Sequence, residues 1–151
     1  IQFLGNRTSQ MGGMTFSNGS VLYYGSMGQT AVLSMEYEAE IAEADRSDYA
    51  KQHSSLVTQD NYTMQWIDGF AWGEDGYLYF TTNKLHRFFL RNMDWNGEDG
   101  INIRIMRVYV GATSYMMGQI STVTTTTAAG SSSKGKGLDA VSGVVWLVLV
   151  I

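Results

Sequence analysis

The chain has 151 residues, a formal net charge of −4 and no cysteine. Its length suits one domain with a real hydrophobic core, and its acidic balance, with 16% charged residues, argues against a nucleic-acid partner. Without cysteine the chain has no disulfides, no thiolate nucleophile and no cysteine-based zinc site.

The first predicted elements are two strands of a hairpin, at residues 14–17 and 20–25. Asn18-Gly19 lies between them, and such pairs tolerate the positive φ of a tight turn. A third strand is predicted at 29–36 and a fourth at 54–59. The connection at 36–51 is interpreted as an excursion between sheets with one helical turn.

A second copy of this pattern begins about 57 residues later. Residues 63–72 lead into Asp75-Gly76, and 77–82 form the clearest strand of the copy. Residues 83–90 fit neither the helical nor the strand period. A loop is predicted at 92–100, and a strand with both faces partly covered at 101–110.

A repeat near 50 residues, built of short antiparallel strands, has the size of one propeller blade. The sequence therefore predicts an all-β fold with about two blades of four-stranded antiparallel sheet. Propellers close with about four to eight blades, and the chain begins at Ile1 without an initiator Met. We therefore expect this chain to be the C-terminal part of a longer polypeptide. Its partners would then be the preceding blades of the same polypeptide. The alternative is a complete small β-domain.

The composition changes after Gln119. Residues 119–143 form a linker rich in Thr, Ser and Gly, which is predicted to be disordered. An apolar tail follows at 144–151. Small residues, a polar spacer and a terminal apolar run are typical of a GPI-anchor signal, so membrane attachment through a lipid is one expectation. A truncated or disordered apolar tail is the other.

Catalytic motifs do not stand out in the sequence. The two histidines, His53 and His86, lie too far apart for a metal-ligand motif, and no metal, cofactor or catalytic residue is predicted. Asp68 and Asn83 suit the binding of a protonated amine, to which an aromatic face adds about 0.5–2 kcal/mol. Three Asn-x-Ser/Thr sequons predict glycosylation, at Asn6, Asn18 and Asn61.

Several blocks together resemble the C-terminal blades of the yellow/major royal jelly protein family. They are Leu4-Gly5-Asn6-Arg7, residues 24–32, Phe70-Ala71-Trp72, residues 76–88 and residues 103–108. The resemblance covers roughly residues 2–118, in the order and spacing of the blocks. It implies a secreted six-bladed propeller, with residues 1–118 similar to about its last third.

Members of this family include dopachrome-converting enzymes of the melanin pathway, amine-binding salivary proteins and nutritive glycoproteins. The resemblance places ligand-binding positions at Asn83, Leu85 and Asp68 or Gly69, where Leu85 replaces an aromatic residue and His86 the more usual Gln. With Phe70 as the neighbouring aromatic, we expect an aromatic amine or catechol derivative to bind at the propeller axis. A dopachrome isomerase and a structural or nutritive glycoprotein without a ligand are the alternatives.

Overall fold

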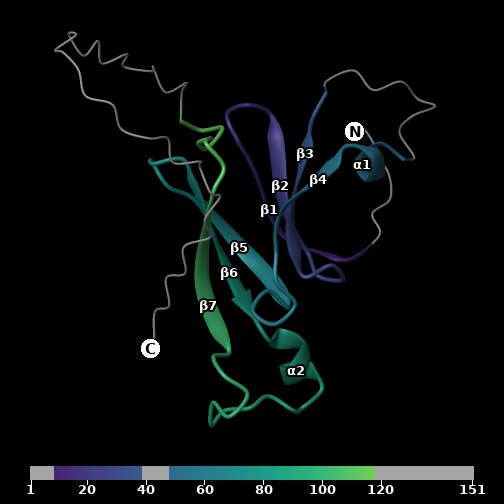
Figure 1. Cartoon of the computed structure of the whole chain (residues 1–151), viewed down its shortest axis with the longest axis vertical. Coiled ribbons are helices and arrows are strands. Elements are labelled where there is room, and N and C mark those ends of the chain that lie inside the picture. The colour runs from purple at the N-terminus through teal and green to yellow at the C-terminus, as the bar shows by residue number, and fades with distance from the viewer. Residues whose placement is uncertain (1–8, 39–47, 118–151) are drawn as a thin grey trace, which may run out of the picture.

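The computed structural model describes residues 9–38 and 48–117, which form two antiparallel sheets in chain order (Figure 1). The first sheet has four strands in the order β1-β2-β3-β4: Met11–Phe16, Val21–Ser26, Ala31–Glu36 and Ser54–Gln59. The second has three in the order β5-β6-β7: Trp66–Trp72, Tyr77–Asn83 and Ile103–Tyr109. Two short helices lie in connections, α1 at Tyr49–Gln52 and α2 at Leu85–Phe89.

The all-β fold and the predicted strands are confirmed, and the structure differs from the prediction in several details. Within the described residues the second sheet has three strands where the prediction had four. The helix α2 lies where no element was predicted. The repeat is 56 residues, from Val21 at the start of β2 to Tyr77 at the start of β6. The residue with positive φ is Ser20 (φ 61°) in the turn between β1 and β2 and Gly76 (φ 80°) in the turn between β5 and β6. The prediction that Asn18-Gly19 provides the positive φ of the first turn is therefore wrong.

The strands β1 and β5 each contain an irregularity at the same position of the repeat. Pairing of β1 with β2 shifts between Met11 and Met14, and pairing of β5 with β6 shifts between Ile67 and Phe70. An extra residue at such a bulge bends the strand and increases its twist. The sequence repeat is therefore also a repeat of backbone geometry.

The core between the sheets is built from one face of each. Tyr23 and Val32 of the first sheet pack with a set of second-sheet residues, namely Ile67, Leu78, Phe80 and Met106. Leu22 and Tyr24 lie in a separate cluster on the other side of the first sheet. They are the repeat equivalents of Leu78 and Phe80, so the two sheets meet through opposite faces of the repeat. Such head-to-tail packing closes into a ring when the rotation allows it.

The sheets approach most closely at β1 and β5 and diverge toward β4 and β7 (Figure 1). A Cβ atom placed on Gly12 would lie 1.7 Å from the carbonyl oxygen of Ile67, so no side chain fits there. The Trp72 indole Nε1 donates a hydrogen bond of 2.9 Å to Thr15 Oγ1 and joins these two strands. Each sheet is therefore a wedge with its thin edge at β1 or β5.

Among the residues that the structure describes, none covers the face of the second sheet that points away from the first. On β7, Ile103 is 66% exposed and Tyr109 is 62% exposed, whereas Met106 on the opposite face is buried. This differs from the predicted strand with both faces partly covered. In the first sheet the corresponding face is buried by the second sheet.

Candidate functional site

The predicted ligand-binding residues lie at one end of the second sheet or close to it. Asp68 and Phe70 are on β5, Asn83 is the last residue of β6, and Leu85 begins α2. Since Trp66 is the register partner of Asn83, the start of β5 and the end of β6 are adjacent. The backbone therefore brings Asn83 and Leu85 close to the end of β5 that precedes Asp68.

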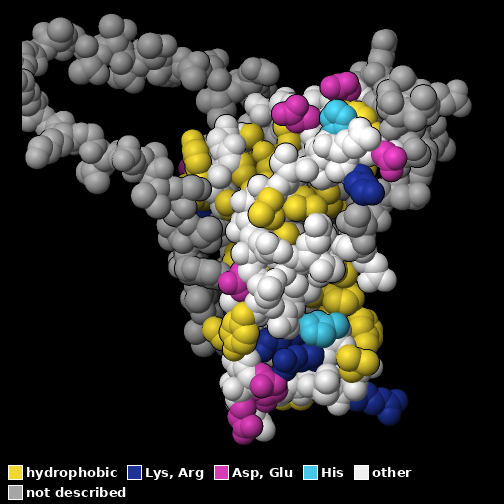
Figure 2. Space-filling view, turned by 45° about the vertical axis from the view of Figure 1, so that its right-hand side comes forward, with side chains coloured by type: hydrophobic (Ala, Val, Ile, Leu, Met, Phe, Trp, Pro, Cys, Tyr) yellow, Lys and Arg dark blue, Asp and Glu magenta, His cyan; other side chains and the backbone are white. Residues whose placement is uncertain are grey.

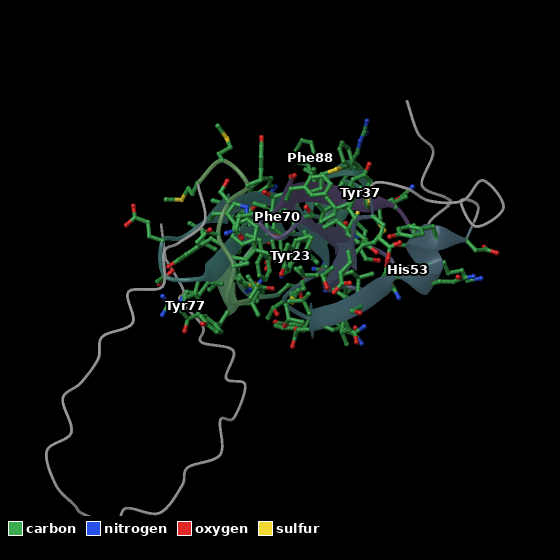
Figure 3. The ribbon with its side chains drawn as sticks, turned by 90° about the horizontal axis from the view of Figure 1, so that it is seen from above. Tyr23, Tyr37, His53, Phe70, Tyr77 and Phe88 are labelled. Atoms are coloured by element: carbon green, nitrogen blue, oxygen red, sulfur yellow. The ribbon has the colours of Figure 1, made fainter. Side chains whose placement is uncertain are left out.

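Asp68 and Phe70 have different surroundings although they are two residues apart. Asp68 lies in the bulge of β5 and is exposed. The Phe70 ring packs against Phe80, with 5.9 Å between ring centroids, and borders the core between the sheets. Figure 3 shows Phe70 beside Tyr23 in the middle of the molecule. Phe70 thus packs toward the core between the sheets, whereas Asp68 is exposed to solvent.

Asn83 has a local structural task. Its Oδ1 atom accepts a hydrogen bond of 2.8 Å from the Leu85 backbone N–H, which fixes the orientation of the side-chain amide where β6 passes into α2. Side chains of register partners lie side by side on an antiparallel sheet. As register partners, Asn83 and Trp66 therefore occupy adjacent positions on neighbouring strands, and Leu85 is half-buried.

Aromatic rings gather around Trp66. The His86 imidazole lies nearly parallel to the indole, at 12° with 6.5 Å between centroids, and the Phe89 ring lies 6.3 Å away. Burial lowers the pKa of His86 below its ordinary value, and the charges of Arg87 and Lys84 lower it further. The imidazole is therefore neutral at neutral pH. The predicted site residues do not include Trp66, because nothing in the sequence pairs it with Asn83.

Basic side chains hold the connection between β6 and β7. Lys84 is 1% exposed, and its Nζ donates a hydrogen bond of 2.6 Å to the backbone oxygen of Asp99. Tyr62 Oη donates to the same oxygen at 3.1 Å, and Arg87 forms an ion pair with the Asp99 carboxylate. The pKa of Lys84 is lowered, chiefly by burial and then by the charges of Arg87 and Arg104. Figure 2 shows basic side chains next to apolar ones at this end.

Cavities lie elsewhere on the described surface. One of about 370 Å³ is on the first sheet, with Tyr24, Leu33 and Ser54 in its lining. Another of about 530 Å³ lies beside α2 and is lined by Phe88, Phe89, Arg91, Met93 and Trp95. Neither of these two is lined by Asp68 or Asn83.

The described residues contain no group of three or more His, Cys, Asp or Glu side chains suited to a metal ion. Among the same residues, no helix is long and apolar enough to cross a membrane. The predicted linker at 119–143 and the apolar tail at 144–151 lie outside the described ranges, so the lipid-anchor prediction remains a prediction.

The two antiparallel sheets are wedge-shaped and pack head to tail, and the second follows the first by 56 residues, the spacing of Val21 and Tyr77. This arrangement defines part of a β-propeller. Residues 1–116 match the family model described as major royal jelly protein. The chain therefore belongs to the major royal jelly protein family, whose members are β-propellers, and the resemblance noted from its sequence is confirmed. No curated protein matches the chain.

Proposed function

We propose that this chain is part of an extracellular propeller that binds small aromatic amines or catechol derivatives beside the thin edge of the second blade. Asp68 binds the ammonium group, and Asn83 provides a polar contact for the rest of the ligand. Phe70 and Leu85 support the site from within the fold. The observation that carries this proposal is that the exposed Asp68 follows Trp66, the register partner of Asn83, by two residues on β5.

The chemistry of these groups supports an amine rather than an anion. A carboxylate and an amide oxygen accept hydrogen bonds from an ammonium group, and aromatic faces attract cations. The neutral imidazole of His86 adds no repelling charge at neutral pH. The family match supports an extracellular location, because its members are typically secreted.

Calorimetric titration of the full-length protein with serotonin and dopamine tests this proposal. We expect binding, and we expect Asp68→Asn to weaken it about tenfold, because an ion pair with hydrogen bonds is lost. Glu74→Gln is the matched control, since Glu74 is an exposed acid just beyond the opposite end of β5. Equal affinities of Asp68→Asn and the parent protein would contradict the assignment.

The same preparation distinguishes the alternatives. Accelerated loss of dopachrome colour would favour an isomerase over a binding protein. Absence of both binding and turnover would favour a structural or nutritive glycoprotein and would overturn the proposal.

We also propose that the protein carries N-linked glycans. Asn61 is exposed in the turn before β5, and its Oδ1 accepts a hydrogen bond of 2.6 Å from Thr30 Oγ1. Asn18 lies half-buried in the turn between β1 and β2, and its backbone N–H donates to the Thr113 oxygen. Asn6 lies outside the described residues. Of the two described sequons, Asn61 is the more accessible.

A further inference from the structure

We propose that Trp66 is the residue on which the aromatic ring of the ligand stacks. This inference rests on the proposed amine-binding function and names a stacking residue for the same site. The family resemblance implies an aromatic residue at the position of Leu85, but leucine has no ring on which a ligand could stack. The structure makes Trp66, which has a ring, the register partner of Asn83.

The neighbours of Trp66 prepare it for this role. His86 and Phe89 pack near the indole and restrict its rotation, so a ligand does not have to order a freely moving side chain. The charge of His86 also matters, because a protonated imidazole would add to the positive charges of Arg87 and Lys84, and its lowered pKa disfavours that form. The Trp66 indole is therefore an aromatic surface whose orientation is fixed by His86 and Phe89.

The spacing of Trp66 and Asp68 fits an arylethylamine. Two residues of a regular strand span about 6.6–6.8 Å, which is the scale of an aromatic ring joined to an ammonium group by two carbons. Asp68 lies in the irregularity between Ile67 and Phe70, which alters this spacing locally. Asp68 is exposed and Trp66 is half-buried, so a ligand in solvent can reach both side chains. A ligand lying along β5 places its ring on Trp66 and its ammonium group at Asp68.

The cavity beside α2 is an alternative aromatic surface for the ligand ring. Its lining includes Phe88, Phe89, Arg91 and Trp95. Trp95 is 75% exposed there, and no carboxylate lines this cavity. Trp95 is thus the appropriate control, because it is a tryptophan at the same end of the molecule without a carboxylate positioned as Asp68 is.

The experiment is a titration of serotonin into the full-length protein, its Trp66→Leu variant and its Trp95→Leu variant. We expect Trp66→Leu to weaken binding about threefold to tenfold, the loss of one aromatic pair, and Trp95→Leu to leave it unchanged. Trp66→Phe should restore most of the affinity. Equal affinities of Trp66→Leu and the parent protein would overturn the inference while leaving the amine-binding function in place.

A second measurement needs no variant that could fail to fold. In NMR spectra of the parent protein, we expect serotonin to shift the indole Nε1–H resonance of Trp66 and not that of Trp95. Saturating serotonin that leaves the Trp66 resonance in place would overturn the inference. If serotonin does not bind the parent protein at all, the proposed function fails, and this inference falls with it.

Discussion

At the scale of single residues, glycine sets how closely the two sheets approach. Gly12 on β1 faces the Ile67 backbone, where a Cβ atom would lie 1.7 Å from the carbonyl oxygen. A backbone atom cannot move aside as the end of a flexible side chain can. The absence of a side chain at this position is therefore a packing requirement of the junction.

We expect Gly12→Ala to reduce the free energy of unfolding by about 1–3 kcal/mol, because the sheets must separate to admit the methyl group. Gly19→Ala is the control, since its Cβ would meet only Ser17 Oγ at 3.8 Å, an ordinary contact. Urea unfolding of both variants measures the difference. Equal midpoints for the two variants would show that the sheets do not approach as described.

His86 gives the stability of the fold a dependence on pH. Its pKa is lowered from the ordinary value of 6.5, so below that value the unfolded chain binds a proton that the folded chain does not. Acidification through this range therefore favours unfolding, and the contribution of His86 is fully present above it.

We expect the parent protein to lose more stability than His86→Gln between about pH 7.5 and about pH 5.5. Urea unfolding at both pH values, with NMR titration of the His86 ring, provides the measurement. A ring pKa at or above 6.5, or an equal loss in both proteins, would contradict this account.

At the scale of elements, the buried cation Lys84 helps to hold the connection between β6 and β7. Lys84 Nζ donates to the Asp99 oxygen, and the Asp94 carboxylate accepts hydrogen bonds from three backbone N–H groups, those of Asn96, Gly97 and Asp99. The first interaction fastens the loop to the sheet, and the others shape the loop itself.

We expect Lys84→Met to accelerate hydrogen exchange of the Asp99 and Gly100 amides about tenfold, because a charged hydrogen bond is lost. The Gly100 amide bonds to the Gly97 oxygen at 3.0 Å and reports on the loop directly. Lys51→Met is the control, since Lys51 is exposed and remote from this loop. Unchanged exchange in Lys84→Met would show that the cation does not hold the loop.

The strands could be predicted from the sequence, whereas their local irregularities could not. Asp75-Gly76 and the aromatic run after it identify the hairpin correctly, because turn residues and β-preferring residues act locally. Gly19 was misassigned because Ser20 has the positive φ instead. The helix α2 has five residues, too few to establish a period.

The candidate site was predictable only in part, because some of its contacts depend on strand pairing and not on local sequence. Asp68 and Asn83 were identified as polar anchors near aromatic residues, and both lie at or near one end of the second sheet. The pairing of Trp66 with Asn83 depends on the register and on the bulge between Ile67 and Phe70. Register between strands is a tertiary property, which a single sequence with no bulge signal does not specify.

At the scale of the whole molecule, the two sheets are repeats that meet through opposite faces. The first sheet covers Leu78 and Phe80 of the second, and the second leaves its own outer face open at Ile103 and Tyr109. An open apolar face of this kind fits a further wedge of the same design. The account therefore requires a ring of sheets around a central axis, with β1 and β5 nearest that axis.

An experimental structure of the full-length protein tests this claim most directly. We expect Tyr23 to pack against Trp72 across the junction of neighbouring blades, as their edge-to-face rings do here with 5.5 Å between centroids. We also expect another sheet to cover Ile103 and Tyr109. A closed barrel, or two sheets separated by other elements with that face exposed to solvent, would contradict this claim.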